Sequence, residues 1–138
     1  GIDLSAKSIE AASESINDHK RYGKQVWFLQ ADLLRLPFAD GSFNLVATSG
    51  ALEYVPLEDG LAEIARVLVT GGHLIFLPCK PSLISNLLER LFCFRVYPPE
   101  RVMASTMYHF EILSHHHFPL DEPIGWSKTV ILGRKLSR

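Results

Sequence analysis

Short apolar runs alternate with helical hydrophobic patterns along most of the chain, and this alternation restricts the possible folds more than any other feature. Residues 26–29, 43–48 and 74–77 form three apolar, mostly bulky runs of the length of a strand. Such runs are expected of strands that are covered on both faces of a sheet. Apolar residues recur at helical spacing in the intervening segments, from Ala6 to Tyr22 and from Leu57 to Leu68. The pattern therefore predicts an α/β fold.

The C-terminal part of the chain follows a different pattern. Residues 108–118 and 128–133 are β-like runs joined by a loop that contains Pro, Gly and Asp, which predicts an antiparallel hairpin. Before them, residues 82–94 carry an apolar stripe at helical spacing. We interpret this stripe as a crossover helix packed on the sheet, with a lid over an apolar ligand as the alternative.

The composition excludes several classes of protein. The chain has 138 residues, of which 47% are hydrophobic, so it is long enough for one domain with its own core. Its 14 basic and 15 acidic side chains give a net charge of −1, which argues against nucleic-acid binding by phosphate neutralisation. Its two cysteines make neither a disulfide framework nor a zinc site, and no apolar run approaches the ~20 residues of a membrane span. We therefore expect a single cytoplasmic domain over residues 1–138.

Two aspartates follow predicted strands. Asp3 comes at the carboxyl end of a short first strand, directly before a helix, and Asp32 comes just after the run at 26–29. In open parallel α/β sheets, ligands bind beyond the carboxyl ends of the strands. A carboxylate at the first position can accept from both hydroxyls of a ribose, and one at the second from an exocyclic amine such as that of adenine. The alternative is that each aspartate is only a helix cap or turn residue, because Asp is common in such turns.

A third element follows the strand predicted at 43–48. Ser49 and Gly50 are small, and small residues at the end of a strand let a ligand approach the backbone closely. An ordinary tight connection between strand and helix would also explain them. Each of the three elements is a weak indication alone, and their order and spacing carry more information than any one of them.

Four segments carry a resemblance to a known family: residues 30–46 (QADLLRLPFADGSFNLV), 52–55 (LEYV), 61–68 (LAEIARVL) and 71–75 (GGHLI). In this combination the sequence resembles the class I S-adenosylmethionine-dependent methyltransferases, and most of all their ubiquinone/menaquinone-biosynthesis-type branch. The resemblance is close from residue 1 to residue 77 and covers the rest only as a general strand–loop–strand ending. It implies a Rossmann-like, doubly wound, mostly parallel sheet that ends in a C-terminal antiparallel hairpin.

The resemblance also implies a cofactor, S-adenosylmethionine, whose methyl group would pass to a small-molecule acceptor. Asp3, with the adjoining Leu4, would hold the ribose hydroxyls of the cofactor. Asp32 and the backbone of Leu33 would hold the edge of the adenine. Because neither the cysteines nor the histidines have the spacing of metal ligands, we expect no metal ion.

At the third element, Ser49 with Gly50 would lie against the methionine portion of the cofactor. The sequence departs from the family nearby, because Asn44 stands where the family usually has Asp and Tyr54 where His is frequent. A larger departure is the absence of the glycine-rich loop that follows the family's first strand. We therefore expect an N-terminally truncated domain whose sheet lacks the first strand and the glycine-rich loop and is divided into two halves.

The sequence does not single out a catalytic residue. Methyl transfer from a sulfonium takes its electrophile from the cofactor, so a general base is needed only for a weakly acidic acceptor. The candidate bases are Glu53, Tyr54, His109 and His115. Residues 115–117 are consecutive histidines, but consecutive residues of a strand point to alternate faces, so we expect no metal site there.

Two other classes of function remain open. A methyltransferase-like module without the cofactor loop could bind partners without catalysis. A nicotinamide-dependent oxidoreductase would also place an acid after its second strand, but it would not explain Ser49 or the run from Asp32 to Phe38. We favour an enzyme that methylates a small molecule, with an apolar acceptor as the working hypothesis. The identity of the acceptor and the oligomeric state stay open.

Overall fold

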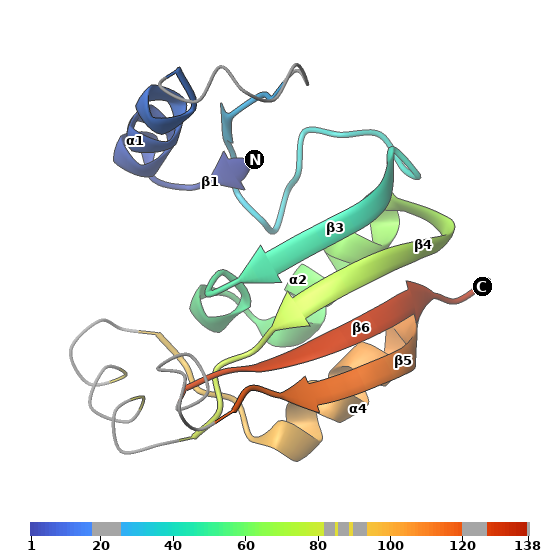
Figure 1. Cartoon of the computed structure of the whole chain (residues 1–138). Coiled ribbons are helices and arrows are strands. Elements are labelled where there is room, and N and C mark those ends of the chain that lie inside the picture. The colour runs from blue at the N-terminus through green and yellow to red at the C-terminus, as the bar shows by residue number, and fades with distance from the viewer. Residues whose placement is uncertain (18–25, 82–84, 86–88, 90–93, 120–126, 138) are drawn as a thin grey trace. The chain divides into compact units, whose positions relative to one another are not determined.

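The structure is a computed structural model that describes residues 1–17, 26–81, 85, 89, 94–119 and 127–137. The chain divides into two compact units, Gly1–Pro37 and Phe38–Arg138, and each is described separately (Figure 1). In the first unit, strand β1 (Ile2–Asp3) leads into helix α1 (Ala6–Asn17), and strand β2 (Leu29–Gln30) follows. Whether the units make one domain, as the sequence predicts, stays a prediction.

The first unit is held by a short parallel pairing and by local caps. Ile2 pairs with Leu29 and Asp3 with Gln30, so β1 and β2 run parallel. Helix α1 begins after Ser5, whose Oγ accepts a hydrogen bond from the backbone N–H of Ser8 at 3.3 Å, as expected of an N-cap. The helix was predicted to run to Tyr22, but residues beyond Asn17 lie outside the part described.

The strand expected at 26–29 is wrong in its position and its burial. Strand β2 contains only Leu29 and Gln30, and the three residues before them are not in a strand. Val26 and Trp27 are 47% and 74% exposed, so this run is not covered on both faces. Strand β2 pairs with β1 over two residue pairs, Ile2 with Leu29 and Asp3 with Gln30.

The second unit is built on a four-stranded sheet. Its elements, in chain order, are β3 (Phe43–Ser49), the short 3-10 helix η1 (Leu52–Tyr54), α2 (Leu57–Val67), β4 (Leu68–Leu77), α4 (Pro99–His109), β5 (Phe110–His117) and β6 (Thr129–Lys135). The strands lie in the order β3-β4-β6-β5. Strands β3 and β4 are parallel, whereas β6 is antiparallel to both β4 and β5. The sheet is therefore mixed, and the predicted α/β class and C-terminal antiparallel hairpin are confirmed.

The core of the second unit lies between its sheet and helices α2 and α4, which cover the same face of the sheet (Figure 1). Along β4, Leu68, Gly72, Leu74 and Phe76 are buried, and the other residues of the strand are less so. Leu57 and Leu61 of α2 are 0% exposed, as the helical spacing of their segment predicts. Ile131 of β6 is also buried.

Helix α4 was not predicted. It begins with Pro99 at its first turn, a position that proline favours because its missing N–H needs no partner there. Val102 and Thr106 are its buried residues, one turn apart, and Thr106 Oγ1 donates to the carbonyl of Val102 at 2.7 Å. Residues 108 and 109, predicted as β-like, belong to this helix, and β5 begins only at Phe110.

The described strands form two separate sheets, β1-β2 and β3-β4-β6-β5, in agreement with the predicted division into two halves. Among the described residues, β3 pairs only with β4. The crossover helix or lid expected at 82–94 falls almost entirely outside the part described. No helix in the described part of the chain is long and apolar enough to cross a membrane.

Candidate functional site

Asp3 ends β1, as expected, and its carboxylate takes part in a local turn. Its Oδ1 accepts a hydrogen bond from the backbone N–H of Ser5 at 2.7 Å. No described residue hydrogen bonds to its second oxygen, Oδ2, and the residue is exposed. The next residue, Leu4, is 70% exposed, and its carbonyl accepts from Nε2 of Gln30 at 2.9 Å. The turn is therefore present, and the second carboxylate oxygen has no partner among the described residues. A cofactor-binding role for Asp3 stays a prediction.

Asp32 has a closely similar environment. It lies two residues after β2, and its Oδ1 accepts from the backbone N–H of Leu34 at 2.9 Å. Here too, the described residues offer no partner to Oδ2. Leu33, beside it, is half-buried. Because β1 and β2 are parallel, Asp3, at the end of β1, and Asp32, just after β2, lie at the carboxyl ends of neighbouring strands, at one edge of this sheet.

Ser49 ends β3 in the second unit, where it meets a lysine from the far end of the sequence. Nζ of Lys128 donates to Oγ of Ser49 at 2.5 Å. Gly50 follows with φ of +73°, a left-handed conformation that glycine adopts at no steric cost. A Cβ at Gly50 would lie 3.8 Å from Nζ of Lys128. Sequence reasoning missed Lys128, because no local pattern signals a contact across 79 positions.

We call Ser49, Gly50 and Lys128 the Ser49 corner. The 3-10 helix η1, which follows this corner in the chain, carries a buried acid that contacts the residues after β4. Glu53 is 3% exposed, and its Oε1 accepts from the backbone N–H of Cys79 at 2.9 Å. Its Oε2 is buried and has no partner among the described residues. Burial, together with the negative charge of Glu53, raises the pKa of the Cys79 thiol to about 11, while Lys128 opposes the rise. Cys79 is therefore a thiol, not a thiolate, at neutral pH.

A cavity of about 350 Å³ opens from this end of β4. It runs between residues 78–81, helix α4 and the strands β5 and β6, and most of its lining is apolar: three prolines, Val102, Met103 and Ile131. The polar lining includes Cys79, which pairs with Lys128 in an isolated antiparallel bridge. Cys79 lines the cavity and its partner Lys128 contacts Ser49, so the cavity lies next to the Ser49 corner.

Two histidines of β5 reach into this cavity. His115 pairs with Ile131 and His117 with Thr129, and a register shift between Ile112 and Ser114 puts both imidazoles on the helix-covered face. Their ring centroids are 4.9 Å apart, whereas His116 does not line the cavity, which confirms the predicted alternation. Burial, followed by the neighbouring imidazoles, lowers the pKa of His115 below its usual value.

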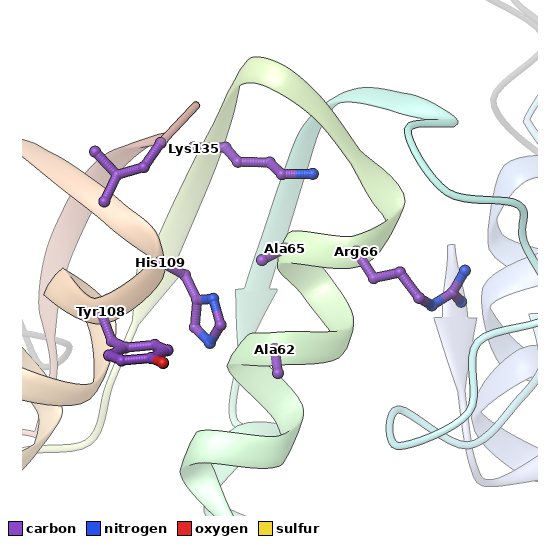
Figure 2. A pocket seen from close by; sticks show the side chains of 7 residues that line it. Ala62, Ala65, Arg66, Tyr108, His109 and Lys135 are labelled. Carbon is purple, nitrogen blue, oxygen red and sulfur yellow. The ribbon is translucent and has the colours of Figure 1, made fainter. Parts of the chain in front are cut away.

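A second cavity, of about 320 Å³, lies at the opposite end of this sheet, where β4 begins. Figure 2 shows the side chains of Tyr108, His109, Lys135 and Arg66 around it. Nζ of Lys135 donates to the carbonyl of Leu68 at 2.7 Å. Arg66 forms ion pairs with Glu63 and Asp40 at 2.8 and 2.7 Å. Both cationic side chains that line this cavity, Lys135 and Arg66, thus have partners in the protein. The cavity also lies away from the carboxyl ends of the parallel strands, where ligands bind in such sheets.

The four candidate bases lie at different places relative to these cavities. His109 lines the second cavity, away from the Ser49 corner, and its role as a base stays a prediction. Tyr54 is 62% exposed, with its ring centroid 5.9 Å from that of Phe94. Glu53 lies beside the Ser49 corner, and His115 lines the cavity next to it. The described residues contain no group of three or more His, Cys, Asp or Glu side chains suited to a metal ion.

Comparison with known proteins identifies the family. The family described as "Methyltransferase domain" matches residues 1–76. Over 79 residues the chain is 40% identical to a demethylmenaquinone methyltransferase of Thermus thermophilus, which covers 55% of this chain and 36% of that protein. Over 82 residues it is 37% identical to a ubiquinone/menaquinone biosynthesis C-methyltransferase of Hahella chejuensis, covering 58% and 32%. The chain thus spans about a third of the length of these relatives.

Solved structures share the fold. A geranyl diphosphate C-methyltransferase from Streptomyces coelicolor, crystallised with Mg²⁺, geranyl diphosphate and S-adenosyl-L-homocysteine, aligns with 99% of this chain and 62% of its own, with a TM-score of 0.81 and 15% identity. A SAM-dependent methyltransferase from Methanosarcina mazei aligns with 100% of this chain and 82% of its own, with a TM-score of 0.79 and 19% identity. The fold and the match over residues 1–76 agree: the chain belongs to the methyltransferase domain family.

Proposed function

We propose that this chain is the S-adenosylmethionine-binding part of an enzyme that transfers a methyl group to a small-molecule acceptor. The observation that carries the proposal is the family match over residues 1–76, which includes Asp3, Asp32 and Ser49 at or just after the carboxyl ends of three strands. The named methyltransferase relatives support the same activity.

The chemistry of the donors and acceptors in the first unit fits this cofactor. Asp3 and Asp32 each use one carboxylate oxygen for a backbone N–H and keep the other for a ligand. Ribose hydroxyls and the adenine amine are donors, so these oxygens are suitable acceptors. We assign Asp3 with Leu4 to the ribose, and Asp32 with the backbone of Leu33 to the adenine.

In the second unit, we assign Ser49 and Gly50 to the methionine portion. Gly50 adopts a positive φ, and the atom nearest to its absent side chain is Nζ of Lys128, at ordinary contact distance. A larger residue would be strained there and would occupy the space beside Ser49. The glycine thus leaves room for a ligand against the end of β3.

The cavity beside this corner supports an apolar acceptor. Its lining is mainly proline and aliphatic side chains, with His115 and His117 as the polar groups of β5. Such a lining suits an apolar molecule that carries one hydrogen-bonding group. The Streptomyces neighbour was crystallised with geranyl diphosphate, which contains a hydrocarbon chain. We therefore propose an apolar acceptor that enters this cavity.

The residues of the chain would act mainly by alignment. When bound, the cofactor supplies the methyl group as an electrophile. The apolar cavity would exclude water and orient the acceptor, and orientation alone lowers such a barrier by several kcal/mol. For a weakly acidic acceptor, His115 is the preferred base, because its lowered pKa keeps the imidazole neutral and able to accept a proton at pH 7.

Calorimetric titration with S-adenosylhomocysteine tests the cofactor proposal. The titration uses this chain and a chimera in which the N-terminal part of the Thermus relative precedes Gly1. In the form that binds, Asp3→Ala should weaken binding by about 1–3 kcal/mol, because a charged hydrogen bond to the ribose is lost. The matched control is Glu10→Ala, an exposed acid of helix α1.

The outcomes separate the alternatives. Binding that Asp3→Ala weakens and Glu10→Ala does not change supports the cofactor site. Absence of binding in both the chain and the chimera contradicts the enzyme proposal and favours a non-catalytic methyltransferase-like module. Binding that Asp3→Ala leaves unchanged removes Asp3 from the site.

We further propose a cytoplasmic location. Among the described residues Cys79 is a free cysteine, as expected of a protein kept in a reducing compartment. Fractionation of cells that express the native protein tests this location, and recovery in the membrane fraction would contradict it.

A further inference from the structure

We propose that Lys128 is a cofactor-binding residue whose ammonium, together with Ser49, binds the carboxylate of the cofactor's methionine portion. This inference rests on the proposed function, because it takes S-adenosylmethionine as the ligand at the end of β3. It adds a residue from the C-terminal hairpin, outside the segment that the family match covers.

Among the described residues, no carboxylate lies within ion-pair distance of the ammonium of Lys128. Its Nζ donates to Oγ of Ser49, a neutral hydroxyl, and forms no ion pair among the described residues. In contrast, the arginines Arg66, Arg101 and Arg134 each lie against a carboxylate. An ammonium has three donors, so Lys128 keeps donors for an anion.

The backbone around Lys128 is fixed before any ligand binds. Lys128 pairs with Cys79 in an antiparallel bridge. On either side of it, the N–H of Lys80 donates to the carbonyl of Ser127 at 2.8 Å, and the N–H of Thr129 donates to that of Pro78 at 3.3 Å. The lysine is half-buried, and its ammonium is placed without the cost of ordering a free surface side chain.

The geometry favours a carboxylate over other anionic groups. Ser49 accepts from Lys128, so its own O–H is left to donate, and the described residues offer it no acceptor. Two donors on adjacent side chains match the two oxygens of a carboxylate. Gly50 presents no side chain next to them, and its Cβ position lies 3.8 Å from the ammonium. The space in front of the pair therefore stays open.

Two ligands that differ by the carboxylate test the assignment. S-adenosylhomocysteine carries the amino-acid group, and 5′-methylthioadenosine has the adenosine and the sulfur without it. Both are titrated into the wild type, Lys128→Met and Lys128→Arg, in this chain and in the chimera described above. The matched control is Lys7→Met, which removes an equal charge from an exposed position of helix α1. Thermal unfolding of each variant reports whether it folds.

We expect Lys128→Met to weaken S-adenosylhomocysteine binding roughly 10- to 100-fold, as for loss of a charged hydrogen bond, and to leave methylthioadenosine binding unchanged. Lys128→Arg should restore most of the affinity, and Lys7→Met should bind as the wild type does. Equal binding of S-adenosylhomocysteine by Lys128→Met and wild type would overturn the inference alone. So would an equal loss for both ligands, which indicates a structural role. If the wild type binds neither ligand, the proposed function fails as well.

Discussion

Residues 1–37 and residues 38–138 support their predicted site residues in different ways. In the first unit, Leu36 is the only buried residue among those described, and Asp3 and Asp32 are held by turns of their own backbone. In the second unit, Ser49 ends a seven-residue strand of a sheet that is covered by two helices. Local hydrogen bonds are thus sufficient to orient a carboxylate, whereas the Ser49 corner depends on tertiary packing.

The largest expected effect is the loss of a core side chain from the second unit. Leu61 of α2 is 0% exposed, so Leu61→Ala should lower the free energy of unfolding by about 3 kcal/mol through lost burial and a cavity. The matched substitution in the first unit, Leu4→Ala, removes a side chain that is 70% exposed and should cost less than about 0.5 kcal/mol. Urea unfolding measures both. Equal losses of unfolding free energy would contradict the difference in packing between the two units.

A smaller effect is expected at Gly72 in β4. A Cβ there would lie 2.9 Å from the carbonyl oxygen of Val69 and 3.2 Å from that of Asn44, so the backbone must move. Gly72→Ala should destabilise the second unit by about 2 kcal/mol in the same unfolding assay.

The control for this substitution is Gly71→Ala, whose Cβ meets nothing within 4 Å but whose φ is +74°. It should cost only about 1 kcal/mol, from the left-handed backbone alone. A larger loss of unfolding free energy for Gly71→Ala than for Gly72→Ala would contradict this prediction, because close backbone packing would then not be the reason for a glycine at position 72.

In the first unit, we expect the N-cap of α1 to contribute more to stability than the packing of side chains does. Ser5→Ala removes the oxygen that accepts from the N–H of Ser8, and should destabilise α1 by about 1 kcal/mol. Hydrogen exchange of the α1 amides should then quicken while that of β4 stays the same.

Ser13 provides the control, because its Oγ donates to the carbonyl of Ile9 within the same helix. Ser13→Ala should leave the α1 amides protected or more protected, since Ala favours a helix and the bond to a helix carbonyl adds little. Slower exchange in Ser5→Ala would show that the cap does not support α1.

The smallest effect concerns a surface ion pair of the second unit. Arg101 donates two hydrogen bonds to Glu58, and with the help of Ser105 this lowers the pKa of Glu58 from 4.5 to about 2. Because the folded-state pKa is the lower one, the contribution to stability is present above about pH 4.5 and is lost as the pH falls from 4.5 to 2.

Both side chains are half exposed, so Glu58→Gln should cost only about 0.5 kcal/mol at pH 7. Unfolding free energies at pH 7 and pH 3 measure the loss, and the difference between wild type and Glu58→Gln should shrink at the lower pH. A constant difference would contradict a role for the charge of Glu58.

The same contrast explains what the sequence could predict. Helix α2 and strand β3 lie where the periodicity places them, because α2 buries one face in the core and apolar spacing records that burial. The prediction for residues 26–29 was wrong because Val26, Trp27 and Leu29 are exposed, so an apolar run did not indicate a covered strand here. Helix α4 was missed because one of its two buried residues, Thr106, is polar by type.

The candidate site divides in the same manner. The positions of Asp3 and Asp32 were predictable, since an acid at a strand end is a local signal: Asp3 is the last residue of β1, and Asp32 comes two residues after the parallel strand β2. The contact between Lys128 and Ser49 was not predictable, because it requires β6 to pair with β4. No sequence pattern around Lys128 indicates that pairing. The cavity at His115 likewise depends on a register shift in β5.

The bridge between Cys79 and Lys128 has a consequence for local unfolding. If an anion is bound at Lys128, then fraying of the first residues of β6 must release that anion, so the ligand and the strand end protect each other. Ligand concentration would then set how often this end of β6 opens, by mass action. The amide of Thr129, which donates to Pro78 at 3.3 Å, is the natural reporter of that opening.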